Sequence, residues 1–262
     1  MKSYIKNNKI ITQIIEIHAS HVCNFKCESC SHFSFATYDK NLNPLDLESQ
    51  LKIWSEKIQP FELKILGGEP LLNRNLESIL RICKKYFPNS LLRVASNGFL
   101  IKNTKINLNI FKELQVSLEI SIHDDSSEYL HALTENLNIL NKNKIPFKCN
   151  NSIISWRRTH KVIDNIITPF QDGDPRKSWE MCDSKFYPQL FNNKIYKCPP
   201  TTYIRLINKQ PISDLFEPMM KYKPLEHTAS LEDTLAFFNK EDEEICSLCP
   251  AKIEFFKKQY KD

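Results

Sequence analysis

The feature that most constrains this chain of 262 residues is a closely spaced cysteine motif near its N-terminus. Cys23, Cys27 and Cys30 have the spacing CxxxCxxC and follow a largely apolar run, residues 11–17, that is typical of a strand. A strand that leads into a cysteine loop indicates a metal site at the carboxyl edge of a sheet. Three thiolates cannot saturate a cubic four-iron cluster, so one iron stays open, and chemistry usually occurs at an open metal position. A zinc site that lacks one ligand and three unrelated thiols are the alternatives that the spacing leaves open.

Further polar segments come at the ends of later strand-like runs. They are Gly67-Gly68-Glu69-Pro70 after residues 61–66, Ser96-Asn97-Gly98 after 91–95, and His123-Asp124 after 115–122. The chain has only four glycines, and an adjacent pair lets a backbone approach a ligand closely. Helical stretches separate these runs, so we expect an α/β fold in which all the polar segments lie on one rim of a parallel sheet or barrel.

Together these motifs resemble the radical S-adenosylmethionine (SAM) superfamily over roughly residues 10–170. The resemblance implies a partial (β/α)6-type barrel in which the three cysteines hold a [4Fe–4S] cluster and SAM chelates the open iron. It also implies that SAM is cleaved to a 5′-deoxyadenosyl radical that abstracts a substrate hydrogen atom. The positions implied to contact SAM are Gly67, Gly68, Glu69, Ser96, Asn97 and Ser121. A carboxylate that caps the following helix is the alternative interpretation of Glu69.

Two assignments at this rim are open: the role of one residue pair and the residue that holds the SAM carboxylate. His123 and Asp124 are either a proton-acceptor pair at the substrate or part of a turn. Related enzymes often use an arginine to hold the SAM carboxylate, but none lies between Arg93 and Arg157 in this chain. Arg157 or Arg158 is therefore the candidate for that contact.

A second set of cysteines follows a turn-rich segment at residues 171–175. Two of these cysteines bracket a predicted hairpin with an Asn-Asn turn, and the other two form CxxC. They are Cys182, Cys198, Cys246 and Cys249. Four thiolates complete a zinc or an iron–sulfur site, and ligand type alone slightly favours zinc.

The position of these cysteines after a radical SAM barrel resembles the SPASM and Twitch extensions. In the Twitch form four cysteines fully ligate one auxiliary [4Fe–4S] cluster, and the layout here is similar to that of 2-deoxy-scyllo-inosamine dehydrogenase. We therefore expect a barrel domain at residues 10–170 and a small hairpin-plus-helix iron–sulfur domain at 171–262.

The reaction predicted first is dehydrogenation of an alcohol carbon in a sugar or aminocyclitol. Loss of a hydrogen atom from a carbinol carbon leaves a radical that is readily deprotonated and oxidised, and a cluster without an open iron can accept the electron. Epimerisation is the second hypothesis, with Cys149 as hydrogen donor or, in the alternative, as a buried strand cysteine. A peptide-modifying maturase ranks third. A zinc-stabilised binding module is the non-enzyme alternative, and it leaves GGEP and SNG unexplained.

Composition restricts the partners and the compartment. The formal charge of +5 comes from scattered lysines, which gives no indication of nucleic-acid binding. The sequence has no apolar run of membrane-spanning length and no signal-peptide core. Nine cysteines without a secretion signal favour a reducing, cytoplasmic location and metal binding over disulfides. The expected partners are a small-molecule substrate and an external electron donor such as flavodoxin or ferredoxin.

Overall fold

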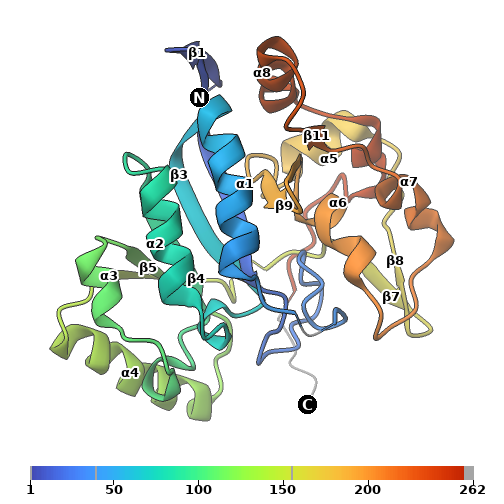
Figure 1. Ribbon diagram of the computed structural model, residues 1–262. Helices are drawn as coiled ribbons and strands as arrows, with labels where there is room; N and C mark the ends of the chain where they lie inside the picture. Colours follow the sequence, from blue (N-terminus) through green and yellow to red (C-terminus); the bar gives the residue numbers. More distant parts are fainter. Residues whose placement is uncertain (1, 39, 155, 257–262) are drawn as a thin grey trace.

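The computed structural model describes residues 2–38, 40–154 and 156–256 (Figure 1). Within these residues a nine-stranded sheet has the order β11-β10-β9-β2-β3-β4-β5-β6, and β1 (Tyr4–Lys6) pairs with β2 outside this path. Five consecutive strands, β2 to β6, run parallel. Their bounds are β2 (Lys9–Ser20), β3 (Ile58–Gly67), β4 (Leu91–Ser96), β5 (Ser117–Ile122) and β6 (Phe147–Asn151). The predicted α/β fold with a parallel sheet is confirmed.

Helices connect the parallel strands and cover one side of the sheet (Figure 1). They are α1 (Pro44–Lys57), α2 (Leu76–Tyr86), α3 (Asn109–Glu113) and α4 (Ser127–Lys142), with short 3-10 turns η1 (Pro70–Leu72) and η2 (Ile101–Asn103). Asn43 caps α1, and α2 ends two residues before Pro88, where a proline would interrupt a longer helix. Cys83 is fully buried with the apolar residues of α2, so this thiol belongs to the core.

Alternation along the strands separates an apolar face from a charged one. Ile15, Leu63 and Val94 are buried in the core beneath the helices. On the opposite face of the curved sheet, Lys64 Nζ lies 3.8 Å from Glu16 and 3.7 Å from Glu119. Because successive side chains point to opposite faces, the inner surface of the partial barrel is polar and ion-paired.

The C-terminal region contains short elements. Its strands β9 to β11 continue the same sheet, whereas β7 and β8 form a separate two-stranded sheet. Its strands are β7 (Lys161–Ile163), β8 (Ile166–Thr168), β9 (Gln189–Phe191), β10 (Lys194–Tyr196) and β11 (Leu225–Glu226). Its helices are α5 (Pro175–Met181), α6 (Pro199–Tyr203), α7 (Glu217–Met220) and α8 (Leu231–Asn239), with 3-10 turns η3 (Ile204–Leu206), η4 (Asp214–Phe216) and η5 (Glu244–Leu248). Asn192 and Asn193 have φ of +50° and +59°, as the predicted hairpin turn requires. Strand β9 is parallel to β2, so the two regions share one sheet.

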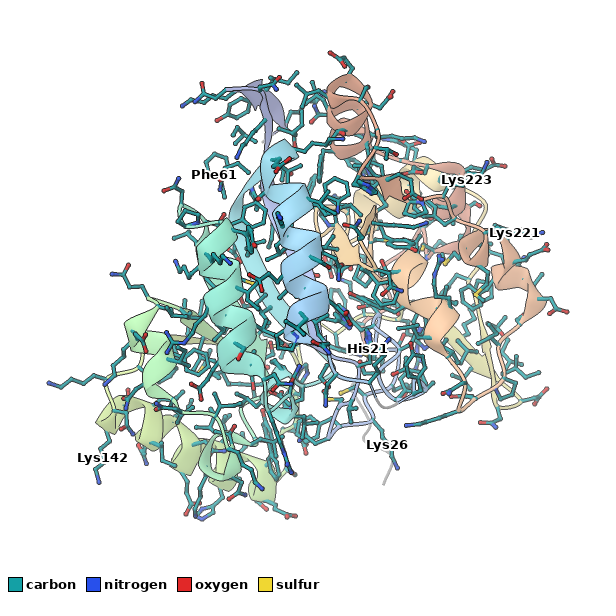
Figure 2. All side chains as sticks on the ribbon, in the orientation of Figure 1. His21, Lys26, Phe61, Lys142, Lys221 and Lys223 are labelled. Atoms are coloured by element: carbon teal, nitrogen blue, oxygen red, sulfur yellow. The ribbon has the colours of Figure 1, made fainter. Side chains whose placement is uncertain are left out.

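The surface agrees with the scattered charge of the sequence. Lys26, Lys142 and Lys221 project from different sides of the molecule (Figure 2). In the described part of the chain, no helix combines the length and apolar character that crossing a membrane requires.

Candidate active site

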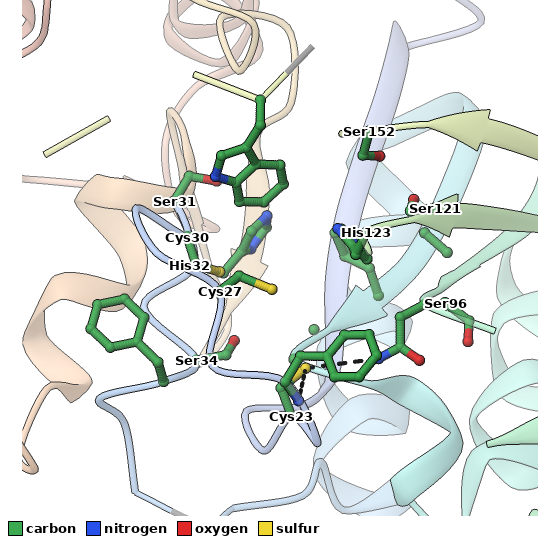
Figure 3. A pocket seen from close by; sticks show the side chains of 18 of the residues that line it. Cys23, Cys27, Cys30, Ser31, His32, Ser34, Ser96, Ser121, His123 and Ser152 are labelled. Atoms are coloured by element: carbon green, nitrogen blue, oxygen red, sulfur yellow. Dashed lines mark hydrogen bonds between the residues drawn. The ribbon is translucent and has the colours of Figure 1, made fainter. Parts of the chain in front are cut away.

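The predicted cysteine loop forms one side of a cavity of about 220 Å³ at the carboxyl ends of the parallel strands. Cys23, Cys27 and Cys30 all line it. Figure 3 shows the three thiols facing Ser96, Ser121 and His123, which come from the strand ends. The other predicted residues in the lining are Gly67, Gly68 and Asn97. The structure therefore brings the three cysteines and most of the predicted SAM positions to one cavity.

The adjacent glycines let two backbones pack directly on each other. Gly68 N donates a hydrogen bond to Ser20 O at 2.8 Å, and Glu69 N donates to Val22 O at 2.7 Å. A Cβ atom at Gly68 would lie 2.2 Å from Val22 O, and one at Gly67 would lie 2.0 Å from Ser20 O. The close approach made here is to the backbone of the cysteine loop, which these contacts hold against β3.

Glu69 is fully buried and joins the loops that follow β3 and β4. It accepts hydrogen bonds from Leu71 N at 3.0 Å, Ser96 Oγ at 2.8 Å and Asn97 N at 2.9 Å. Burial raises the pKa of its carboxyl to about 7, although the three hydrogen bonds act in the opposite direction and lower it. Glu69 caps η1, as the alternative interpretation supposed, and it is not among the cavity-lining residues. Its contact with SAM stays a prediction.

Asn97 connects the strand rim to the cysteine loop. Its Nδ2 donates to Asn24 Oδ1 at 2.8 Å and lies 4.0 Å from Cys23 Sγ. The Tyr129 hydroxyl, from α4, donates to Asn97 O at 2.8 Å. Asn24 and Tyr129 were not predicted from the sequence, although Asn24 follows a motif cysteine directly.

The structure separates the predicted pair at positions 123 and 124. His123 lines the cavity, where its ring packs edge-on against Trp156 with centroids 5.6 Å apart. Asp124 accepts hydrogen bonds from Ser126 N at 3.0 Å and Ser126 Oγ at 2.9 Å, so it belongs to the turn before α4. Cys149 is exposed on β6 and is not among the residues that line the cavity. Of these three predicted catalytic residues, His123 alone faces the cavity.

Lys64 and His32 also line this cavity and were missed by the sequence analysis. Lys64 was detectable in principle, because alternation along β3 places it on the same face as Leu66, at the rim. His32 Nδ1 lies 2.6 Å from His18 Nε2, and His18 Nδ1 lies 3.1 Å from His21 Nδ1. Burial lowers the pKa of His32 to about 3 and that of His21 to about 4, so this row of imidazoles is neutral.

The second set of cysteines lines a separate cavity of about 100 Å³ in the C-terminal region. The helix α5 precedes one of them, the hairpin β9–β10 precedes the next, and the CxxC pair begins in η5 and ends just after it. They are Cys182, Cys198, Cys246 and Cys249. Burial raises the pKa of the Cys182 thiol to about 12 and that of the Cys198 thiol to about 11. Ser31 lines both cavities, so it forms part of a wall between them.

The lining of the second cavity fits an anionic four-thiolate cluster. Its cationic residues are Arg157, Arg158, Lys185, Lys197 and Lys252, and its acidic residues are Asp183 and Glu241. Two of its buried N–H donors, Trp179 Nε1 and Arg157 Nε, have no hydrogen-bond partner within the described part of the chain. No three His, Cys, Asp or Glu side chains of the described residues are grouped to hold a single metal ion. Thiolates around a cubane bind different irons, so they do not need to converge on one point.

The two arginines considered for the SAM carboxylate lie at this second cavity. Arg157 Nη1 donates to Met181 O at 2.9 Å and pairs with Asp183 at 3.0 Å. Arg158 Nη1 pairs with Glu28 Oε1 at 2.5 Å. Neither arginine is among the residues that line the first cavity.

Comparison with known proteins gives one family match and several partial relatives. The family model of the radical SAM superfamily matches residues 17–152, slightly more than half of the chain. GTP 3′,8-cyclase of Sulfurimonas denitrificans is 29% identical over 115 residues, covering 42% of this chain and 35% of the relative. GTP 3′,8-cyclase of Helicobacter pylori (strain HPAG1) is 26% identical over 146 residues, covering 50% and 45%. The chain thus spans less than half the length of these curated relatives.

A solved structure is similar over nearly the whole chain. BtrN in complex with AdoMet and 2-DOIA has a TM-score of 0.52 and 16% identity, covering 95% of this chain and 98% of BtrN. At this identity the similarity shows the fold alone. That fold includes the region of the second cavity as well as the barrel.

Proposed function

Because this chain belongs to the radical SAM superfamily, we propose that it is an oxidoreductase that dehydrogenates an alcohol carbon of a sugar or aminocyclitol. Membership implies SAM and one [4Fe–4S] cluster as cofactors. When bound, the reduced cluster cleaves SAM to methionine and a 5′-deoxyadenosyl radical, which abstracts a hydrogen atom from the substrate. The residues proposed to hold the cluster are Cys23, Cys27 and Cys30, which share one cavity.

The cavity lining supports a hydroxylated substrate. Small hydroxyl and amide side chains dominate its polar surface, and they are Ser31, Ser34, Ser96, Asn97, Ser121 and Ser152. Lys64 adds an ammonium group whose nearest carboxylate oxygens, at 3.7 and 3.8 Å, are beyond hydrogen-bond distance. Hydroxyl, amide and ammonium groups are suited to the dense hydroxyl pattern of a sugar or aminocyclitol. We assign substrate contact to Ser31, Ser34, Ser152 and Lys64, SAM contact to Ser96, Asn97 and Ser121, and proton acceptance to His123.

The observation that carries the choice of reaction is the second four-thiol cavity beside the first. After the hydrogen atom leaves the carbinol carbon, the hydroxyl proton and one electron must also leave to give a ketone. We assign the electron to an auxiliary [4Fe–4S] cluster held by Cys182, Cys198, Cys246 and Cys249. The shared wall at Ser31 supports this short route, and the cationic lining supports an anionic cluster. An external electron donor such as flavodoxin or ferredoxin is proposed to reduce the SAM-binding cluster.

Epimerisation is the second hypothesis, and the position of Cys149 argues against it. A hydrogen donor must contact the substrate radical, whereas this thiol is exposed and is not part of the cavity lining. A peptide-modifying role remains the third hypothesis. The names of the partial relatives add GTP to the compounds that need testing.

The test is anaerobic reconstitution followed by mass spectrometry with separate panels of sugars, aminocyclitols, peptides and GTP. We expect a product that has lost two hydrogens from a sugar or aminocyclitol, together with 5′-deoxyadenosine. A product whose mass is unchanged after incubation in H₂O, and which gains one deuterium when the incubation is done in D₂O, would instead establish epimerisation. The full-length variant with Cys23, Cys27 and Cys30 replaced by alanine is the control, and it should form no 5′-deoxyadenosine.

A further inference from the structure

The second cavity contains buried hydrogen-bond donors that lack an acceptor. Among the described residues, six buried side-chain nitrogen or oxygen atoms have no partner, and two of them line this cavity. They are Trp179 Nε1 and Arg157 Nε. A buried donor without a partner has lost its hydrogen bonds to water and gained none in exchange. Two such donors among the residues that line the cavity indicate that its occupant supplies the acceptors.

The surroundings of Trp179 hold its indole ring in place. Trp179 lies in the last turn of α5, and its carbonyl accepts a hydrogen bond from Cys182 N at 3.1 Å. Arg176 and Lys185 both lie 4.9 Å from the ring centroid, and Phe186 packs against the ring edge-on. Ion pairs with Glu180, Glu241 and Asp242 fix Arg176 in turn. The ring is therefore held by its own contacts, its N–H is buried, and Trp179 is one of the residues that line the cavity.

We propose that the Trp179 N–H donates a hydrogen bond to a sulfur of the auxiliary cluster and thereby raises the reduction potential of that cluster. This inference rests on the proposed function, which places a [4Fe–4S] cluster in this cavity. Reduction adds one negative charge to an already anionic group, so an N–H donor stabilises the reduced state more than the oxidised state. Trp179 thus tunes the electron acceptor by direct contact with the cluster and does not touch the substrate.

The test measures potential, independently of activity. The full-length chain with Cys23, Cys27 and Cys30 replaced by alanine carries the auxiliary site alone, and Trp179→Phe is introduced into it. Phenylalanine keeps an aromatic ring and removes the N–H. In an EPR-monitored redox titration, we expect the equilibrium constant for reduction of the auxiliary cluster to be about tenfold smaller in Trp179→Phe than in the parent. For one electron this lowers the reduction potential by about 59 mV. The matched control is Phe186→Leu, which alters the packing of the ring but keeps the N–H, and its potential should stay unchanged.

A second measurement covers the outcome in which Trp179→Phe loses its iron. Protein labelled with ¹⁵N-tryptophan should show an electron spin-echo coupling between the reduced auxiliary cluster and one indole nitrogen. Absence of that coupling, or an unchanged potential in Trp179→Phe with full iron and sulfide, would overturn the inference and leave the proposed function standing. Bound zinc without sulfide in the parent protein would overturn both.

Discussion

A Cβ atom at Gly68 would lie 2.2 Å from Val22 O and 2.4 Å from Val22 C, inside the cysteine loop. Both neighbours are backbone atoms, so they cannot rotate away as a side chain would. We expect Gly68→Ala to lower the free energy of unfolding by about 3 kcal/mol, the upper end for overpacking, and to displace the loop. Iron bound per chain after reconstitution, together with urea unfolding, measures both effects.

The matched control for this substitution is Gly173→Ala. A Cβ atom there meets nothing within 4 Å, although φ of +71° makes alanine strained by about 1–2 kcal/mol. That variant should keep its full iron content. If Gly68→Ala also bound iron normally, the proposed packing of Gly68 on the loop would be wrong.

His160 should make the protein sensitive to acid. Its ring is buried against Phe33, with centroids 5.0 Å apart, and burial and then the charge of Arg158 lower its pKa to about 3. In the unfolded chain the ring takes up a proton below about pH 6.5, whereas in the folded chain it does so only near pH 3. Its contribution to stability is therefore full above pH 6.5 and is lost as the pH falls toward 3.

The variant His160→Gln removes this titration. Between about pH 6 and pH 4 we expect its free energy of unfolding to fall less steeply than that of the parent, by up to about 1.36 kcal/mol per pH unit. Urea unfolding at several pH values measures the slope. His131→Gln is the control, since that side chain is 81% exposed on α4. Equal slopes for the parent and His160→Gln would contradict the assignment.

At the scale of elements, β9 is joined to β2 by a buried polar network. Gln189 Nε2 donates to Glu16 Oε2 at 2.6 Å, and the Tyr203 hydroxyl donates to Gln189 Oε1 at 2.9 Å. Backbone pairing adds a hydrogen bond from Glu16 N to Pro188 O at 2.9 Å. Gln189 therefore connects the barrel to the C-terminal region through two side chains.

Gln189→Ala should loosen this junction. It leaves the buried Glu16 carboxyl and the Tyr203 hydroxyl each short of a partner, for which we expect a loss of about 3 kcal/mol in unfolding free energy. Urea unfolding and the rate of limited proteolysis between residues 161 and 188 report the change. Gln210→Ala, which removes a side-chain bond to Asn165 O at the surface, should change stability by less than about 0.5 kcal/mol. Similar losses in both variants would show that the network does not secure the junction.

The sequence predicted the elements whose signals are local. The strand-like runs at residues 61–66, 91–95 and 115–122 lie close to β3, β4 and β5, helices separate these strands as expected, and the Asn192-Asn193 turn lies in the predicted hairpin. The short strands β9 and β11 join the sheet through two or three residues each, so their pairing depends on tertiary contacts that periodicity does not encode.

The site was predictable to the extent that motifs mark the ends of strands. Alternation predicts which face a side chain lies on, but it does not predict the direction of the loop after a strand. That direction places Asp124 in the turn, one of its two alternatives, and Arg157 at the second cavity. Cys149 shows the same limit. It is exposed because β6 is an edge strand of the sheet, and the alternation of faces along a strand does not predict which strand lies at the edge.

At the scale of the molecule, one sheet places two thiol-lined cavities on either side of Ser31. We therefore expect about eight irons per chain after anaerobic reconstitution, in two four-iron clusters. Alanine at Cys23, Cys27 and Cys30 together should leave roughly half of this iron, with matching acid-labile sulfide. Metal analysis of that variant decides the identity of the second site, since one zinc ion without sulfide would exclude an auxiliary cluster as electron acceptor.

The most direct test of the proposed dehydrogenation follows one hydrogen atom. The reconstituted enzyme is incubated with a substrate found by the mass-spectrometric screen, deuterated only at its reacting carbinol carbon. We predict that deuterium appears in 5′-deoxyadenosine, one atom for each ketone formed, and that the ketone retains none at that carbon. Deuterium-free 5′-deoxyadenosine, or a product that keeps its alcohol and has exchanged that position with solvent hydrogen, would contradict the proposed function.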